Sequence, residues 1–278
     1  MLLNRFILPR QVTKMAKYIE TAKIIFKSQL AYRFDIISSM VFTVTKILLA
    51  YILWGAIFGD QNMISGFTLN SMLTYYIISS FIKQLDQSSG TGWQVADEIK
   101  NGRFSKYIIR PMGVFRYFAS QTAGVSAFLM GFNFIAAVVW IFVFNVDFTI
   151  TENSSSIICA FIMILLGLIF MLQLNYFIGI LAFKFIDTGV FMMVKDNLVE
   201  FVTGSLIPLS ILPAGIIKIM TLFPFYYITY LPSMLLMGRN ENESATGLFV
   251  IIMWNILFGL INFLTFKRLR TNYDGVGI

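Results

Sequence analysis

The residue types that do chemistry in soluble enzymes are scarce in this chain. It has 278 residues, no histidine and a single cysteine, Cys159. Without histidine, a Ser-His-Asp triad and the common zinc sites are excluded, and one cysteine cannot build a disulfide framework. The G-x-x-x-x-G-K-[ST] loop that cradles nucleotide phosphates is also missing. We therefore expect no catalytic residue, no metal and no cofactor on this chain.

Lys46 is the one charged residue well inside a predicted membrane span. A lysine at the middle of a bilayer is unfavourable by about 2.5–3.5 kcal/mol on insertion scales, so its side chain should face protein or water. Lys46 could line or gate a pathway, or it could be a structural lysine that contacts the carbonyl groups of a neighbouring helix. The sequence shows no acidic partner well inside a span, which favours the structural interpretation, but a partner subunit could supply one and both interpretations stay open.

The polar segment Thr91–Pro111 carries the clearest helical pattern outside the apolar runs. Its candidate docking residues are the apolar Trp93, Ala96 and Ile99, which recur at helical spacing, and the charged Asp97, Glu98 and Lys100, which face elsewhere. Asn101-Gly102 predicts the end of this helix, since glycine adopts the left-handed conformation without a side-chain penalty. Such a helix could receive force from a cytoplasmic partner, or the segment could be a basic loop lying on anionic headgroups.

An aromatic run interrupted by prolines occurs late in the chain. Its candidate gate residues are Phe223, Phe225, Tyr226, Tyr227 and Tyr230, with Pro224 and Pro232 among and beyond them. An aromatic belt at the membrane interface would explain the tyrosines, which are enriched at that depth. A belt does not explain the prolines, and we therefore interpret these aromatic residues as an outer gate.

Membrane-spanning helices must position these residues, because the composition excludes a soluble enzyme. Hydrophobic residues make up 58% of the chain and charged residues 13%, with a mean hydropathy of +0.77, whereas a soluble domain is about 25% charged. A helix of about 20 apolar residues crosses the hydrocarbon core. Suitable runs are Ile36–Phe58, Phe67–Lys83, Val114–Phe144, Ile157–Phe183 and Thr246–Phe266, together with the longer stretch Asn197–Met237.

The stretch Asn197–Met237 predicts one span followed by a re-entrant hairpin. Four prolines interrupt it, namely Pro208, Pro213, Pro224 and Pro232, and each removes a helical hydrogen bond or begins a new helix. We expect a span that ends near residues 207–212 and two short helices over about 213–237 that dip into the outer leaflet. Six spans also fit the charges, because 18 of the 21 Lys and Arg residues then share one side with both termini. The positive-inside rule makes that side cytoplasmic.

The predicted fold class is therefore an all-α integral membrane protein with six transmembrane helices. Met15–Phe34 predicts a basic amphipathic helix that lies in the interfacial plane ahead of the first span. The chain then divides into a cytoplasmic N-terminal segment (1–35), a transmembrane domain (36–266) and a cytoplasmic tail (267–278).

Four stretches of the sequence together form a recognisable pattern. They are Gly66–Leu69 with Met72 and Tyr75-Tyr76, Asp97–Pro111, Gly204–Ser210 with Pro213, and Phe223–Phe225 with Tyr230 and Pro232. In this pattern the chain resembles the ABC-2-type permeases, the membrane subunits of ATP-binding-cassette exporters, and more narrowly the subgroup with two permeases and one ATPase. The resemblance covers about Ala16 to Arg270. We expect neither a large extracellular domain nor an added cytoplasmic domain in this chain, which argues against a macrolide-type or peptide-sensing relative.

The resemblance implies roles for three segments. The N-terminal helix would be an elbow helix, Gly92–Gly102 a cytoplasmic coupling helix between spans two and three, and 213–237 the re-entrant helices between spans five and six. It also implies a permease subunit with no catalytic activity of its own. Its partners would be an ATPase dimer, which binds ATP and Mg, and a second, different permease. The complex would lie in the bacterial plasma membrane. We expect no nucleic acid as a partner. The alternative is a stand-alone ion-coupled secondary transporter or channel, which predicts paired broken helices, and the sequence has one broken region, Pro208–Pro232.

Overall fold

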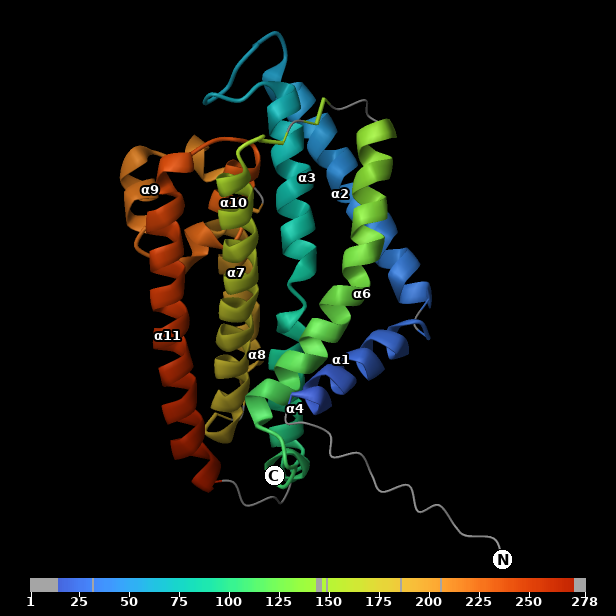
Figure 1. The fold of residues 1–278 in the computed structure, drawn as a ribbon, viewed down its shortest axis with the longest axis vertical. Coiled ribbons are helices and arrows are strands. Elements are labelled where there is room, and N and C mark those ends of the chain that lie inside the picture. The colour runs from blue at the N-terminus through green and yellow to red at the C-terminus, as the bar shows by residue number, and fades with distance from the viewer. Residues whose placement is uncertain are drawn as a thin grey trace, which may run out of the picture.

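The structure is a computed structural model, and it describes residues 15–31, 33–143, 147–148, 150–185, 187–205 and 207–272. The described residues form helices joined by turns, and no strand occurs among them. Figure 1 shows the long helices running side by side along the longest axis of the molecule. The predicted all-α class is therefore confirmed for the described part of the chain.

The helices vary greatly in length. The α-helices are α1 (Ala16–Gln29), α2 (Arg33–Phe58), α3 (Leu69–Leu85), α4 (Ser88–Lys100), α5 (Ser105–Ile108), α6 (Val114–Val143), α7 (Ser154–Ile180), α8 (Gly189–Val202), α9 (Ala214–Met220), α10 (Tyr230–Leu236) and α11 (Ser244–Leu269). Short 3-10 turns are η1 (Leu181–Phe183), η2 (Leu209–Ile211), η3 (Pro224–Tyr227), η4 (Glu241–Glu243) and η5 (Arg270–Asn272).

Three segments of the described chain are long and apolar enough to cross a membrane as single helices. They are Val114–Val139, Ser154–Phe183 and Glu241–Leu269. The helices Ala214–Met220 and Pro224–Leu236 are bent by 90° against each other and would count as a fourth span if taken together. A bent pair therefore occurs where the prolines predict one. Six spans would in addition need α2, α3 and α8.

The two ends of the molecule carry different elements (Figure 1). At one end, called here the α4 end, lie α4, the last turns of α7 and α11, and the first turns of α6. At the opposite end, called the α9 end, lies the bent pair, which consists of α9 and the segment Pro224–Leu236. The helix α7 runs between them and packs against α4, α10 and α11, so one helix contacts elements at both ends.

The amphipathic helix at the start of the described chain packs along the first half of α6. The ring of Phe26 meets that of Phe128 edge to face, with centroids 5.3 Å apart. The hydroxyl of Tyr18 accepts a hydrogen bond of 3.1 Å from the backbone N–H of Gly113. The sequence predicts one helix over Met15–Phe34, whereas α1 ends at Gln29 and α2 begins at Arg33.

The fifth expected span differs most from the structure. We expect a helix from Asn197 to 207–212, but α8 begins at Gly189 and ends at Val202. At the N-terminus of α8, the backbone N–H of Gly189 donates a hydrogen bond of 2.8 Å to Oδ1 of Asp187. It ends because Gly204 adopts a φ of 73°, a conformation that terminates helices. At 14 residues, α8 is about 21 Å long, shorter than the hydrocarbon core.

Candidate functional site

The helix α4 has a buried stripe that faces α7. Gly92, Val95, Ala96 and Ile99 are buried, and they follow the i, i+3, i+4, i+7 spacing of one helical face. Val95 and Ile99 pack in a cluster that includes Tyr176 of α7. Ala96 and Ile99, two of the predicted docking residues, therefore belong to the interior of this chain.

The opposite side of α4 is open. The side chain of Trp93 is 44% exposed, and Gln94, Asp97 and Lys100 are also exposed. Trp93 thus lies apart from Ala96 and Ile99, although the sequence pattern grouped the three together. The correct stripe begins at Gly92, which carries no side chain and therefore gives no hydrophobic signal.

The stripe permits an unusually close approach of α4 and α7. A methyl group on Gly92 would lie 2.8 Å from the backbone oxygen of Asn175. A methyl group on Gly179 of α7 would lie 2.9 Å from the backbone oxygen of Gly92. Small residues at such a crossing are typical of helices that pack within membranes, because they let the two backbones come together.

Ion pairs secure the turn after α4. Arg103 contacts Asp97 at 2.6 Å and Glu98 at 3.5 Å, and Lys106 of α5 contacts Glu98 at 2.8 Å. The hydrogen bond to Glu98 raises the pKa of Lys106 above its usual value. The turn itself depends on Gly102, which has a φ of 68°. Glu98 therefore holds the end of α4 in place, while Asp97 remains largely exposed despite its pair with Arg103.

The helix α4 also contacts α8 and the residues just before it at three points. The ring of Trp93 covers Gly189, where an added methyl would lie 3.4 Å from the indole. Met192 of α8 packs on Gly92, and a methyl group added to Gly92 would lie 2.6 Å from Cε of Met192. At the end of α4, Lys100 and Asp187 approach to 3.6 Å. A displacement of α4 therefore acts directly on the first half of α8.

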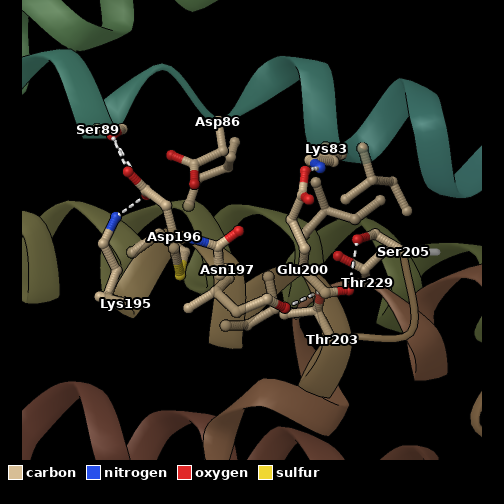
Figure 2. Close-up of a pocket in the computed structure, with 16 residues that line it drawn as sticks. Lys83, Asp86, Ser89, Lys195, Asp196, Asn197, Glu200, Thr203, Ser205 and Thr229 are labelled. Atoms are coloured by element: carbon tan, nitrogen blue, oxygen red, sulfur yellow. Dashed lines mark hydrogen bonds and ion pairs between the residues drawn. The ribbon is translucent and has the colours of Figure 1, made fainter. Parts of the chain in front are cut away.

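A charged cavity lies between α8, the junction of α3 with α4, and α7 (Figure 2). Its volume is about 370 Å³. The charged residues that line it are Lys83, Asp86, Lys195, Asp196 and Glu200, and Figure 2 shows them projecting from the facing helices into the same space. Two ion pairs occur there, between Lys83 and Glu200 and between Lys195 and Asp196. Apolar residues such as Ile164 and Leu168 form the remaining wall.

A chain of hydrogen bonds joins the helices around this cavity. Lys195 donates to the amide oxygen of Asn175 at 2.6 Å, and Asn175 donates to the hydroxyl of Ser88 at 2.7 Å. Ser88 in turn donates to the carboxylate of Asp86. From α8, Asp196 accepts a hydrogen bond of 3.2 Å from Ser89. Burial raises the pKa of Asp86 above its usual value, and the hydrogen bonds from Ser88 oppose that shift.

The predicted gate residues have three different environments. Tyr227 and Phe225 pack inward, the latter against Phe170 of α7 with ring centroids 5.9 Å apart. Tyr226 and Tyr230, whose ring centroids are 4.9 Å apart, line an open cavity of about 550 Å³ at the α9 end.

The exposed ring of Phe223 lies against the indole of Trp254 on α11. The structure therefore brings the five aromatic residues into one region but exposes only part of them to a cavity.

Lys46 lies in α2 (Arg33–Phe58), and its side chain lies outside the described part of the structure. The two interpretations of this residue stay predictions. Among the described residues, no group of three or more His, Cys, Asp or Glu side chains is placed to hold a metal ion.

The sequence pattern missed the charged cavity. Lys195 looks like a basic residue flanking a span, but its side chain is 8% exposed and contacts α7. A usable signal was present, because Asp196 and Glu200 are four residues apart in the mostly apolar run Gly189–Phe201. Acidic residues at that spacing share one helical face, and such a face in an apolar helix must meet polar groups.

Comparison with protein families gives one match that covers most of the chain. A family model described as "ABC-2 family transporter protein" matches residues 44–277. Comparison with curated proteins and with solved structures finds no match.

Proposed function

Because the chain belongs to the ABC-2 family of transporter membrane proteins, we propose that it is a permease subunit of an exporter driven by a separate ATPase. The observation that carries this proposal is the two-sided character of α4. Its buried stripe is packed closely on α7 and α8, while Trp93, Gln94, Asp97 and Lys100 are exposed. A helix with this arrangement can take up force on one side and pass it to the membrane helices on the other.

The exposed side of α4 is the proposed contact with the ATPase. Trp93 offers a large apolar ring, and Asp97 and Lys100 offer charges of both signs, a mixture suited to a polar protein interface with an aromatic anchor. Ala96 and Ile99 would act inside the chain by keeping α4 rigid against α7. Glu98 would act through the turn that follows α4. ATP and Mg would bind to the partner ATPase.

The proposed topology has six spans, formed by α2, α3, α6, α7, α11 and, because α8 alone is shorter than the hydrocarbon core, by α8 together with η2. The α4 end would face the cytoplasm of a bacterial cell and α1 would lie in the interfacial plane as the elbow helix. Arg103, Lys106 and Arg110, which lie near α4, support this orientation, since basic residues collect on cytoplasmic flanks. The bent pair would then dip into the outer leaflet and cap the pathway, with Tyr226 and Tyr230 at the outer gate.

A second permease, which we take to be a different chain, would complete the conduit above an ATPase dimer. Several apolar side chains of α8 are exposed in the single chain, among them Val190, Met193, Leu198 and Phe201. The other face of the same helix contacts the charged cavity. An exposed apolar face next to a polar one is expected of a helix that borders both a partner or lipid and a pathway.

Substitutions on the open side of α4 test the coupling role. Trp93→Ala and Gln94→Arg should reduce co-purification of the ATPase and stop ATP-driven export, while the chain still inserts into the membrane. Arg268→Gln, at the same end of the molecule but on α11, is the matched control and should retain both properties. Full export by both α4 variants with the ATPase bound would refute the coupling role. Uphill transport by the purified chain alone would favour the stand-alone transporter instead.

A further inference from the structure

A second cavity lies at the α4 end, between the start of α6, the end of α7 and the last turns of α11. Its volume is about 380 Å³, within the range of roughly 300–1,000 Å³ typical of ligand sites. Rings of Phe115, Tyr176, Phe263 and Phe266 line it, together with Arg116 of α6 and Arg270 of η5. None of these residues belongs to the site proposed for the ATPase or to the charged cavity beside α8.

The two arginines give this cavity a positive charge. Both are exposed, and neither forms an ion pair with another described residue. Arg270 lies near the ring of Phe266, at 5.7 Å from its centroid. Among the described residues, none that lines the cavity is acidic. Two guanidinium groups at one opening are suited to a phosphate group, because each can donate two parallel hydrogen bonds.

The inner part of the cavity has two hydrogen-bond acceptors without donors. Gln173 and Asn262 are 7% and 6% exposed, and both line the cavity. Their amide nitrogens donate to Asn255 and to the backbone oxygen of Gln173. The oxygens Gln173 Oε1 and Asn262 Oδ1 have no hydrogen-bond partner in the described chain. Buried acceptors left without donors cost about 1–3 kcal/mol each, so an occupant that supplies hydroxyl groups is favoured.

We propose that this cavity binds the headgroup of an anionic phospholipid, with its phosphate between Arg116 and Arg270. Hydroxyl groups of a headgroup such as that of phosphatidylglycerol would donate to the two amide oxygens. The acyl chains would lie on the apolar surface of α11, where Leu260, Phe263 and Leu264 are all more than half exposed. Basic pockets between helices on the cytoplasmic side are known to hold anionic headgroups. The site concerns lipid binding alone and does not depend on the proposed coupling to an ATPase.

Native mass spectrometry of the full-length chain in mild detergent tests the proposal. The chain is incubated separately with phosphatidylglycerol, phosphatidic acid and phosphatidylcholine, and the lipid-bound fraction is measured. Phosphatidylglycerol should bind most tightly. Arg116→Gln and Arg270→Gln should each weaken its binding about fivefold, as expected for one basic residue near an anionic lipid. Arg268→Gln is the matched control, because Arg268 is an exposed neighbour that does not line the cavity, and its binding should equal that of the unaltered chain.

Three results would overturn the proposal, and a fourth would overturn the part of it that assigns the headgroup hydroxyls to the two amide oxygens. Equal binding of phosphatidylglycerol and phosphatidylcholine would exclude a role for lipid charge. Equal losses in Arg268→Gln and Arg116→Gln would show non-specific attraction to a basic surface. Binding of soluble glycerol phosphate as tight as that of the lipid would indicate a soluble ligand. Phosphatidic acid that binds as tightly as phosphatidylglycerol would remove the two amide oxygens from the recognition of the headgroup. Thermal unfolding of each variant establishes that it is folded before binding is compared.

Discussion

Replacement of Gly92 by alanine tests the close crossing of α4 and α7. The added methyl group would lie 2.8 Å from the backbone oxygen of Asn175 and 2.6 Å from Cε of Met192. Met192 can change rotamer, but the oxygen of Asn175 belongs to the backbone of α7, near its C-terminal end, so the two helices must move apart. Overpacking of this kind destabilises by about 1–3 kcal/mol, which corresponds to a fall in Tm of roughly 2–10 °C.

Gly90→Ala is the matched control for this experiment. Gly90 lies in the same helix, and a methyl group there would meet nothing within 4 Å. Alanine favours a helix over glycine by about 1 kcal/mol, so this variant should be as stable as the unaltered chain or more stable. The measurement is thermal unfolding of the purified protein, followed by ATP-driven export in the assembled transporter. If Gly92→Ala unfolds at the same temperature as Gly90→Ala, the close crossing is refuted.

Three further substitutions test contacts elsewhere in the molecule. Lys195→Met removes the donor to a buried amide oxygen on α7 and should destabilise by about 1–3 kcal/mol in thermal unfolding; an unchanged Tm would contradict the buried contact. Tyr75→Phe removes a hydrogen bond of 2.6 Å to the carbonyl of Gly204 and should lower the free energy of unfolding by about 0.5–1.5 kcal/mol. Lys106 has a raised pKa because of its hydrogen bond to Glu98, so its contribution to stability is present below the unfolded-state pKa of about 10.4 and is lost as the pH rises through the folded-state pKa. The difference in Tm between the unaltered chain and Lys106→Met should therefore be constant near neutral pH and disappear at strongly alkaline pH.

Elements with a local cause were predictable from the sequence. Asn101-Gly102 predicts a helix stop, and α4 ends at Lys100 with Gly102 in the left-handed conformation. Prolines predict a break late in the chain, and the bent pair begins directly after Pro213. In each case one residue type restricts the backbone whatever surrounds it, so no tertiary information is needed.

Elements set by tertiary contacts were not predictable in the same way. The buried stripe of α4 starts at a glycine, so the hydropathy pattern placed Trp93 on the wrong face. Lys195 is one of the 18 basic residues that the sequence places on the cytoplasmic side. In the structure its ammonium group meets the amide oxygen of Asn175 and the carboxylate of Asp196. The partner on α7 is 20 residues away in the chain, and no periodic pattern within one helix can reveal it.

The arrangement of α7 restricts how movement can pass between the two ends of the molecule. It is an uninterrupted helix of 27 residues, about 40 Å long. Near one end of α7, Gly179 lies against α4. Near the middle of α7, Gly167 lies against Ile228 of the bent pair. One continuous helix therefore connects the contact with α4 to the contact with the bent pair. The helical path from α3 into α4, in contrast, is broken at Asp86 and Gln87, where the carboxylate of Asp86 accepts hydrogen bonds from the backbone N–H and the hydroxyl of Ser88.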